Sequence, residues 1–230
     1  FFTPYSVDND FFLAQRAIVE TSRQDLRRLH DWPEDVVVIG FSGKLIPLKR
    51  VEDLIDSVAA LQAEGLRAGL LIVGDGSSRA TLEERARARH LKWAQFAGFR
   101  NQSELAASYV CMDVFVLPSR CETWGLVLNE AMLFQLPVIA SSMVGATEDL
   151  IDTGKNGYVF DVGDVARLTD ALRTLVHSAE MRCGFGWHSK AIVEKYSHDV
   201  CLRGTLDALG HVTGRPCMDP QGLESRGTTS

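Results

Sequence analysis

Short apolar runs alternate with segments of helical periodicity along most of this chain, and this alternation constrains its fold more than any other feature. Residues 36–39 and 70–73 are apolar and rich in β-branched side chains, as buried strands are. Between them, residues 51–64 place apolar side chains at helical spacing. The same pattern predicts further strands near 93–97, 114–117, 137–140 and 158–160, and helices near 78–90, 102–111, 125–135, 164–178, 180–195 and 198–209. Continuous apolar strands joined by helices indicate an α/β fold with a doubly wound parallel sheet.

The length of the chain favours one globular domain with loose ends. Its 230 residues, of which 46% are hydrophobic, can bury a sizeable core. We expect this folded body to cover residues 15–210. Residues 1–10 show neither helical nor strand periodicity. Residues 211–230 are rich in Gly, Pro, Ser and Thr and predict a disordered tail.

The composition argues against several classes of partner. A net charge of −6 disfavours nucleic acid, because a polyanion is not attracted to an acidic surface. No run of about 20 apolar residues occurs, so we expect no transmembrane segment, while peripheral membrane contact stays open. The five cysteines form no C-x-x-C pair and no histidine stands at zinc-finger spacing, which favours a reducing cytoplasm and no metal site.

Ligands of parallel α/β sheets collect at the carboxyl ends of the strands, and two lysines follow the first predicted strand there. Lys44 and Lys49 flank a short loop that begins at Gly43, where the missing side chain allows close approach of a ligand. Two ammonium groups in such a loop could bracket a diphosphate. The alternative is that both lysines are simply solvated.

Two glutamates stand eight positions apart around the start of the helix predicted over residues 125–135. Glu122 lies in the loop after the strand at 114–117, and Glu130 lies about two turns into the helix. Gly125 opens the helix, whose first backbone amides have no partner within the helix and, with the helix dipole, favour an anion. One carboxylate could therefore meet hydroxyl groups on each side of a bound diphosphate. The alternative is a pair of surface acids.

Two other nucleotide sites fit poorly. Gly74-Asp75-Gly76 looks like the start of a dinucleotide fingerprint, but the third glycine position is Arg79 and no acidic residue follows at the required distance. The glycines near Lys44 miss the spacing of a phosphate-binding loop and its Ser or Thr. Nicotinamide and ATP sites are therefore disfavoured.

These motifs, in this order, resemble those of retaining glycosyltransferases with the GT-B fold, in the GT4-like group (glycosyl transferases group 1). Glu122 and Glu130 match the E-x7-E signature, and Gly43 to Lys49 resembles G-R-L-x-x-x-K with Lys44 in place of arginine. Gly74 to Gly76 resembles the V-G-x-G turn, and Gly98-Phe99 the loop where the base is held. Leu136 to Ala140, Val144 to Glu148 and Gly154 to Val159 match further family elements, so that the similarity covers roughly residues 4 to 200.

The resemblance implies one half of a GT-B enzyme, namely the Rossmann-like C-terminal domain that binds a nucleotide-sugar. Residues 4–12 resemble the family's interdomain linker, so residues 1–14 are interpreted as a linker remnant and the N-terminal acceptor-binding domain as missing. The chain is accordingly expected to be a fragment of a hexosyltransferase-like enzyme and inactive alone. Its nucleotide-sugar would be a substrate, with no metal or other cofactor.

The resemblance also implies roles for individual residues. Lys44 and Lys49 would neutralise the leaving diphosphate, Glu122 would hold the donor sugar and Glu130 the ribose. The full set of donor-binding residues implied is Gly43, Gly76, Phe99, Ser119, Thr123, Trp124, Gly125, Leu126 and Glu130. A non-catalytic nucleotide-binding module, or an epimerase or phosphorylase of the same architecture, remains as an alternative. Donor base, sugar, acceptor and linkage stay open.

Overall fold

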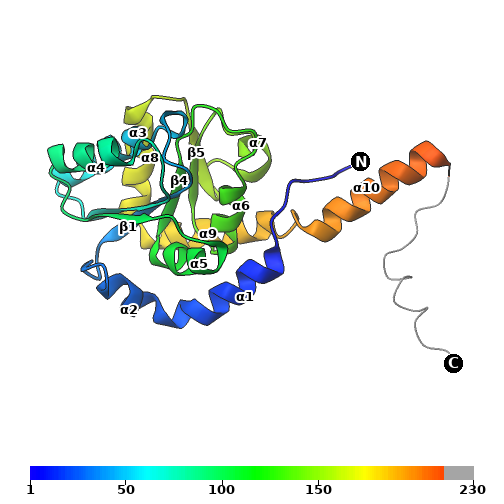
Figure 1. Ribbon diagram of the computed structural model, residues 1–230, viewed down its shortest axis with the longest axis horizontal. Coiled ribbons are helices and arrows are strands. Elements are labelled where there is room, and N and C mark those ends of the chain that lie inside the picture. The colour runs from blue at the N-terminus through cyan, green and yellow to red at the C-terminus, as the bar shows by residue number, and fades with distance from the viewer. Residues whose placement is uncertain (215–230) are drawn as a thin grey trace.

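The computed structural model describes residues 1–214 and contains a six-stranded sheet in which every paired strand runs parallel to its neighbour (Figure 1). The strands are β1 (Val37–Ser42), β2 (Ala68–Val73), β3 (Ala94–Gly98), β4 (Val114–Leu117), β5 (Val138–Ser141) and β6 (Gly157–Phe160). Their order is β3-β2-β1-β4-β5-β6, so the direction of winding reverses between β1 and β4. This order confirms the predicted doubly wound α/β fold, and its switch point is where such sheets bind ligands.

Helices cover both faces of the sheet because every strand is joined to the next through a helix. They are α3 (Val51–Ala63), α4 (Arg79–Ala88), α5 (Gln102–Cys111), α6 (Leu126–Leu133), α7 (Thr147–Leu150), α8 (Val165–His177) and α9 (Ala179–Val193). On one face α3 packs against α4 and α8, and on the other α6 packs against α9. All residues of β1, β2, β4 and β5 are buried, as the continuous apolar runs predicted.

Two N-terminal helices were not predicted. They are α1 (Asn9–Val19) and α2 (Arg23–Arg28), joined by a 3-10 turn over Glu20–Ser22. The Asp8 side chain caps α1 by accepting a hydrogen bond from the Phe11 amide at 2.9 Å. Phe12 is the one fully buried residue of α1, while Phe11, Leu13 and Val19 pack partly buried against the core. The helix also continues across the boundary expected between residues 14 and 15.

The last described element, α10 (His198–Thr213), extends away from the body, and the N-terminal segment runs beside it (Figure 1). Gly204 is its one buried residue, and the Phe2 carbonyl lies where a side chain at 204 would stand. The predicted tail boundary at 211 is wrong for residues 211–213, which are helical because α10 runs on to its left-handed cap at Gly214. The rest of the predicted tail, from 215, lies outside the described residues. Over residues 1–214, every helix falls short of the length and apolar character needed to cross a bilayer.

Candidate functional site

Two adjoining cavities lie at the carboxyl edge of the sheet, and the end of β1 contributes Ser42 and Gly43 to both of them. Each has a volume of about 380 Å³. The α6 cavity is lined by Tyr5, Ser42, Gly43, Lys49, Glu122, Thr123, Trp124, Gly125, Leu126 and Val127. The β2–β3 cavity is lined by Ser42, Gly43, Lys44, Val73, Gly74, Asp75, Phe99, Arg100 and Leu105. The α6 cavity lies at the switch point between β1 and β4, and the β2–β3 cavity adjoins it at the same edge of the sheet, where the sequence predicted a ligand.

The N-terminus of α6 opens into the first cavity through a turn that requires glycine. Gly125 has a φ of +100°, and a Cβ atom there would stand 2.9 Å from the Leu117 side chain. The preceding loop is tied to its neighbour by backbone bonds, from the Gly145 amide to the Glu122 carbonyl at 3.0 Å and from the Ala146 amide to the Trp124 carbonyl at 3.0 Å. This turn directs the first amides of α6 toward the cavity, as an anion site requires.

Lys49 and Glu122 form an ion pair within the α6 cavity. Lys49 ends the 3-10 turn Pro47–Lys49 after β1, and Glu122 lies in the loop after β4, so neighbouring strands bring them together. Their side chains are 18% and 21% exposed. Lys44 has no part in this pair and is exposed in the β2–β3 cavity. The two lysines therefore line two adjoining cavities, one lysine in each, and do not flank the same position.

Glu130 lies in α6 and accepts a hydrogen bond from the hydroxyl of Tyr109, at 2.6 Å from Oε2. Burial raises the pKa of the Glu130 carboxyl, and the hydrogen bond from Tyr109 partly opposes this rise. Burial, together with the nearby Glu130 charge, raises the pKa of Tyr109 well above its ordinary value, while the neighbouring Ser42 hydroxyl lowers it. The carboxylate thus has a defined partner although it lies outside the lining of either cavity.

The Trp124 indole donates a hydrogen bond to a buried side chain and lies tilted against two other rings. Its Nε1–H donates to Oδ1 of the fully buried Asn129 at 3.0 Å. Its ring lies 5.2 Å from that of Tyr5 and 6.3 Å from that of Tyr196. Sequence reasoning missed Tyr5, Asn129 and Tyr109 in this neighbourhood. Asn129 belongs to α6 itself, at an unspecified position of the E-x7-E signature, whereas Tyr5 and Tyr109 are brought to α6 by the fold.

Besides Glu130, two residues of the implied donor-binding set, Gly76 and Ser119, do not line the cavities. Gly76 packs against the loop after β1, where a Cβ atom would lie 2.3 Å from the Leu45 carbonyl oxygen. Ser119 is fully buried, and its Oγ has no hydrogen-bond partner among the described residues. Both shape the loops around the cavities. Phe99, by contrast, is 76% exposed at the rim of the β2–β3 cavity.

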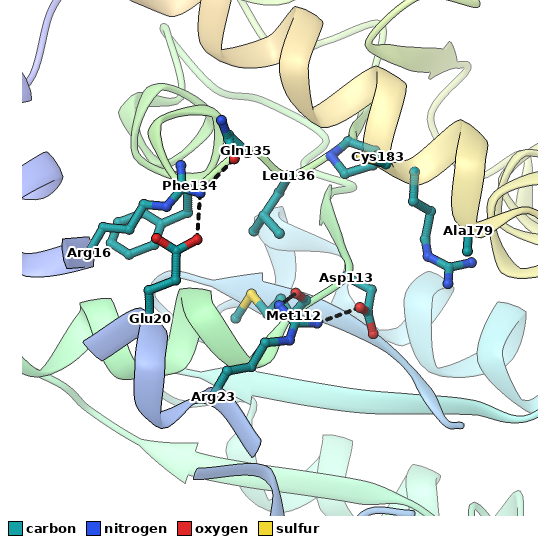
Figure 2. Close-up of a pocket in the computed structure, with 12 residues that line it drawn as sticks. Arg16, Glu20, Arg23, Met112, Asp113, Phe134, Gln135, Leu136, Ala179 and Cys183 are labelled. Carbon is teal, nitrogen blue, oxygen red and sulfur yellow. Dashed lines mark hydrogen bonds and ion pairs between the residues drawn. The ribbon is translucent and has the colours of Figure 1, made fainter. Parts of the chain in front are cut away.

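A third cavity, of about 290 Å³, lies at the opposite edge of the sheet and is shown in Figure 2. Its arginines donate hydrogen bonds to carbonyl groups near the ends of helices. Arg16 donates to the Leu133 carbonyl at 3.2 Å, and Arg23 donates to the Val110 carbonyl at 2.7 Å, so both dock the N-terminal helices onto the carbonyl ends of α5 and α6. Because these hydrogen bonds hold the N-terminal helices against the domain, we interpret the third cavity as a feature of helix packing.

Over the described part of the chain, His, Cys, Asp and Glu side chains form no group of three or more placed to hold a metal ion.

The chain matches the family model described as glycosyl transferases group 1 over residues 22–189. Among curated proteins, it is 37% identical over 161 residues to a GDP-mannose-dependent alpha-mannosyltransferase of Mycobacterium tuberculosis, covering 70% of this chain and 40% of that protein. It is 36% identical over 149 residues to the sulfoquinovosyl transferase SQD2 of Arabidopsis thaliana, covering 64% of this chain and 28% of that protein. The chain thus spans less than half the length of these relatives.

Solved structures share the fold. The Anabaena protein HepE in complex with UDP matches with a TM-score of 0.77 and 21% identity, over 90% of this chain and 57% of that one. The C-terminal domain of a group 1 glycosyl transferase (LpcC) from Francisella tularensis matches with a TM-score of 0.68 and 24% identity, over 76% of this chain and 93% of that one. A half-domain of the GT-B type therefore accounts for the architecture. Because the family model matches residues 22–189, which make up most of the chain, the chain belongs to the glycosyl transferases group 1 family.

Proposed function

We propose that the chain is the donor-binding domain of a retaining glycosyltransferase that transfers a sugar from a nucleotide-sugar to a hydroxyl acceptor. The observation that carries the proposal is the Lys49–Glu122 ion pair, which lies in the cavity into which the N-terminus of α6 opens. A cation and helix amides are suited to a diphosphate, and a carboxylate is suited to sugar hydroxyls. The ion pair therefore supplies a cation for the diphosphate and a carboxylate for the sugar.

The arrangement of the two cavities suggests how a nucleotide-sugar lies in them. In this proposal the diphosphate occupies the α6 cavity and the base occupies the β2–β3 cavity beside Phe99, with the ribose between them near Ser42. Lys44 contributes positive charge from the second cavity. Glu122 then turns from Lys49 to the donor sugar, while Glu130 meets the ribose hydroxyls.

The chemistry assigned to these groups is stabilisation of the departing diphosphate. As the bond to the sugar breaks, negative charge develops on the leaving oxygen, and a fixed ammonium group and oriented amides lower the energy of that state. The proposal assigns this task to Lys49, Lys44 and the amides of Trp124 to Leu126, and it requires no metal ion.

Relatives support the substrate class without fixing the donor. One relative is described as GDP-mannose-dependent, and a structural neighbour was solved with UDP. The acceptor half would come from the part of such proteins that this chain does not span, so we expect nucleotide binding without appreciable sugar transfer by this chain. Cys121 and Cys183 are exposed free thiols, which favours a reducing cytoplasm as the location.

The proposal is tested by titrating the chain with UDP, GDP, ADP and dTDP and comparing Lys49→Ala with the unmodified protein. A hydrogen bond to a charged group is worth about 1.5–3 kcal/mol, so the best diphosphate should bind about 10- to 100-fold more weakly to the variant, and the free nucleoside equally well to both. Lys155→Ala is the matched control, because Lys155 is an exposed, paired lysine before β6, near the opposite edge of the sheet. Equal losses for nucleoside and diphosphate would contradict the assignment.

A further inference from the structure

Glu130 depends on a residue from another helix. Within residues 1–214, the hydrogen bond recorded to its carboxylate comes from Tyr109, in the last turn of α5, at 2.6 Å. The two residues are 21 positions apart, and no sequence motif links them. The residue proposed to meet the ribose is therefore oriented by a side chain outside the family motifs described above.

The Tyr109 ring has little freedom to turn its hydroxyl elsewhere. The side chain is fully buried, stacks on Phe134 with ring centres 5.2 Å apart, and lies tilted against Phe115 at 5.9 Å. Contacts with two rings fix the phenol, so its hydroxyl is aimed at one carboxylate oxygen. Among the described residues, Oε1 and the second lone pair of Oε2 accept no other side-chain hydrogen bond.

The charge state of Glu130 matters because a vicinal diol offers two O–H donors. An ionised carboxylate accepts both, whereas a protonated one carries a proton of its own and loses acceptor capacity. Burial raises the pKa of Glu130, and the hydrogen bond from Tyr109 lowers it. Burial also raises the pKa of Tyr109 well above its ordinary value, so the phenol stays a donor at neutral pH.

Few other charges act on this carboxyl. Among the described residues, Tyr109 is the titratable group that influences the pKa of Glu130. Helices α1 and α9 pack against α6, and Arg16 of α1 reaches its far end, where it donates to the Leu133 carbonyl at 3.2 Å. The pKa of the Glu130 carboxyl is thus determined by burial and by one hydrogen bond.

We propose that Tyr109 is a positioning residue, which holds the Glu130 carboxylate ionised and oriented to accept the ribose hydroxyls of the nucleotide. The inference rests on the proposed function. Its consequence is a pH-dependent preference for ribonucleotides. Binding that needs ionised Glu130 is strong above the pKa of this group and is lost as the pH falls through it. Removal of the Tyr109 hydroxyl raises that pKa further and moves the loss to higher pH.

The test compares the unmodified chain with Tyr109→Phe between pH 5 and 8. The ligands are the ribonucleoside diphosphate that binds best and its 2′,3′-dideoxy counterpart. For Tyr109→Phe we expect the midpoint for the ribonucleotide to move to higher pH, with about a tenfold loss of affinity near the original midpoint, as for one hydrogen bond to a charged group. Dideoxynucleotide binding should be the same in both proteins. Tyr158→Phe is the control, because its hydroxyl contacts Met181 in a different part of the fold.

Two further variants keep the test decisive. Glu130→Gln should bind the ribonucleotide weakly at every pH, because it has no carboxyl to titrate. Replacing Tyr109 with 3-fluorotyrosine preserves the ring and strengthens the donor, so the midpoint should move to lower pH even if Tyr109→Phe fails to fold.

Each contrary result overturns a defined part of the account. An unchanged midpoint in both Tyr109 variants, or equal losses for the ribo and dideoxy ligands, would show that Tyr109 only packs, and would leave the proposed function standing. If the unmodified chain binds no nucleoside diphosphate, the proposed function fails and the role of Tyr109 fails with it.

Discussion

Lys49 and Glu122 neutralise one another, and we expect this pairing to oppose the binding of a nucleotide. A diphosphate must compete with Glu122 for Lys49, whereas an attached sugar gives the displaced carboxylate a new partner. Glu122→Gln is therefore expected to bind the nucleoside diphosphate severalfold more tightly, since an opposite charge at about 4 Å is worth up to ~4 kcal/mol before desolvation. The same variant should lose the extra affinity that the sugar provides.

Titration with the diphosphate and with its sugar conjugate measures both effects. Glu180→Gln, an exposed change in the first turn of α9, is the control. Weaker diphosphate binding by Glu122→Gln would show that Glu122 helps to hold the phosphates and does not compete with them.

The buried carboxyl of Glu130 should make the protein less stable at high pH. Because its folded-state pKa is raised, its contribution to stability is fully present below its unfolded-state pKa and is lost as the pH rises through the folded-state value. Glu130→Gln removes this dependence, and its side-chain oxygen can still accept from Tyr109. Thermal unfolding should therefore show the variant a few degrees more stable than the unmodified chain at pH 8, with the difference shrinking toward pH 4. A variant less stable at pH 8 would contradict a buried charge at this position.

At the scale of elements, the N-terminal helices are held by polar contacts that a sequence pattern cannot reveal. Asp113, directly before β4, accepts hydrogen bonds from Arg23 and Arg27 of α2 and from the Val38 amide. The partners are 75 to 90 residues apart, so neither hydrophobic periodicity nor spacing indicates them. The strands and the helices α3 to α6, α8 and α9 were predictable because each carries its own apolar pattern, whereas α2 depends on this distant carboxylate.

Asp113→Ala should consequently destabilise the fold much more than the loss of a surface acid. The Asp113 side chain is 16% exposed, and its loss leaves two arginines without their anion, at a cost of about 3–5 kcal/mol. Asp25→Ala, in an exposed pair with Arg28, should cost less than ~1 kcal/mol. Urea unfolding of both variants measures the difference. Similar small losses would show that α2 is held chiefly by apolar contacts.

At the scale of the whole molecule, the sequence predicted which edge of the sheet forms the site. It did not predict that the site consists of two adjoining cavities. Apolar runs fix the strands and their carboxyl ends, and the motifs fall in the loops that follow. The separation of Lys44 from Lys49 depends on the 3-10 turn over Pro47–Lys49. The pairing of Tyr109 with Glu130 depends on how α5 packs near α6. Such contacts arise from packing of the whole domain and leave no local signature.

The central claim is that a nucleotide occupies the two cavities at the carboxyl edge, and a crystal structure with the best-binding nucleoside diphosphate tests it most directly. We expect the phosphates against Lys49 and the first amides of α6, the ribose within hydrogen-bond distance of Glu130, and the base in the β2–β3 cavity beside Phe99. A nucleotide bound instead among Arg16, Arg23 and Arg182, in the cavity at the opposite edge of the sheet (Figure 2), would contradict the account.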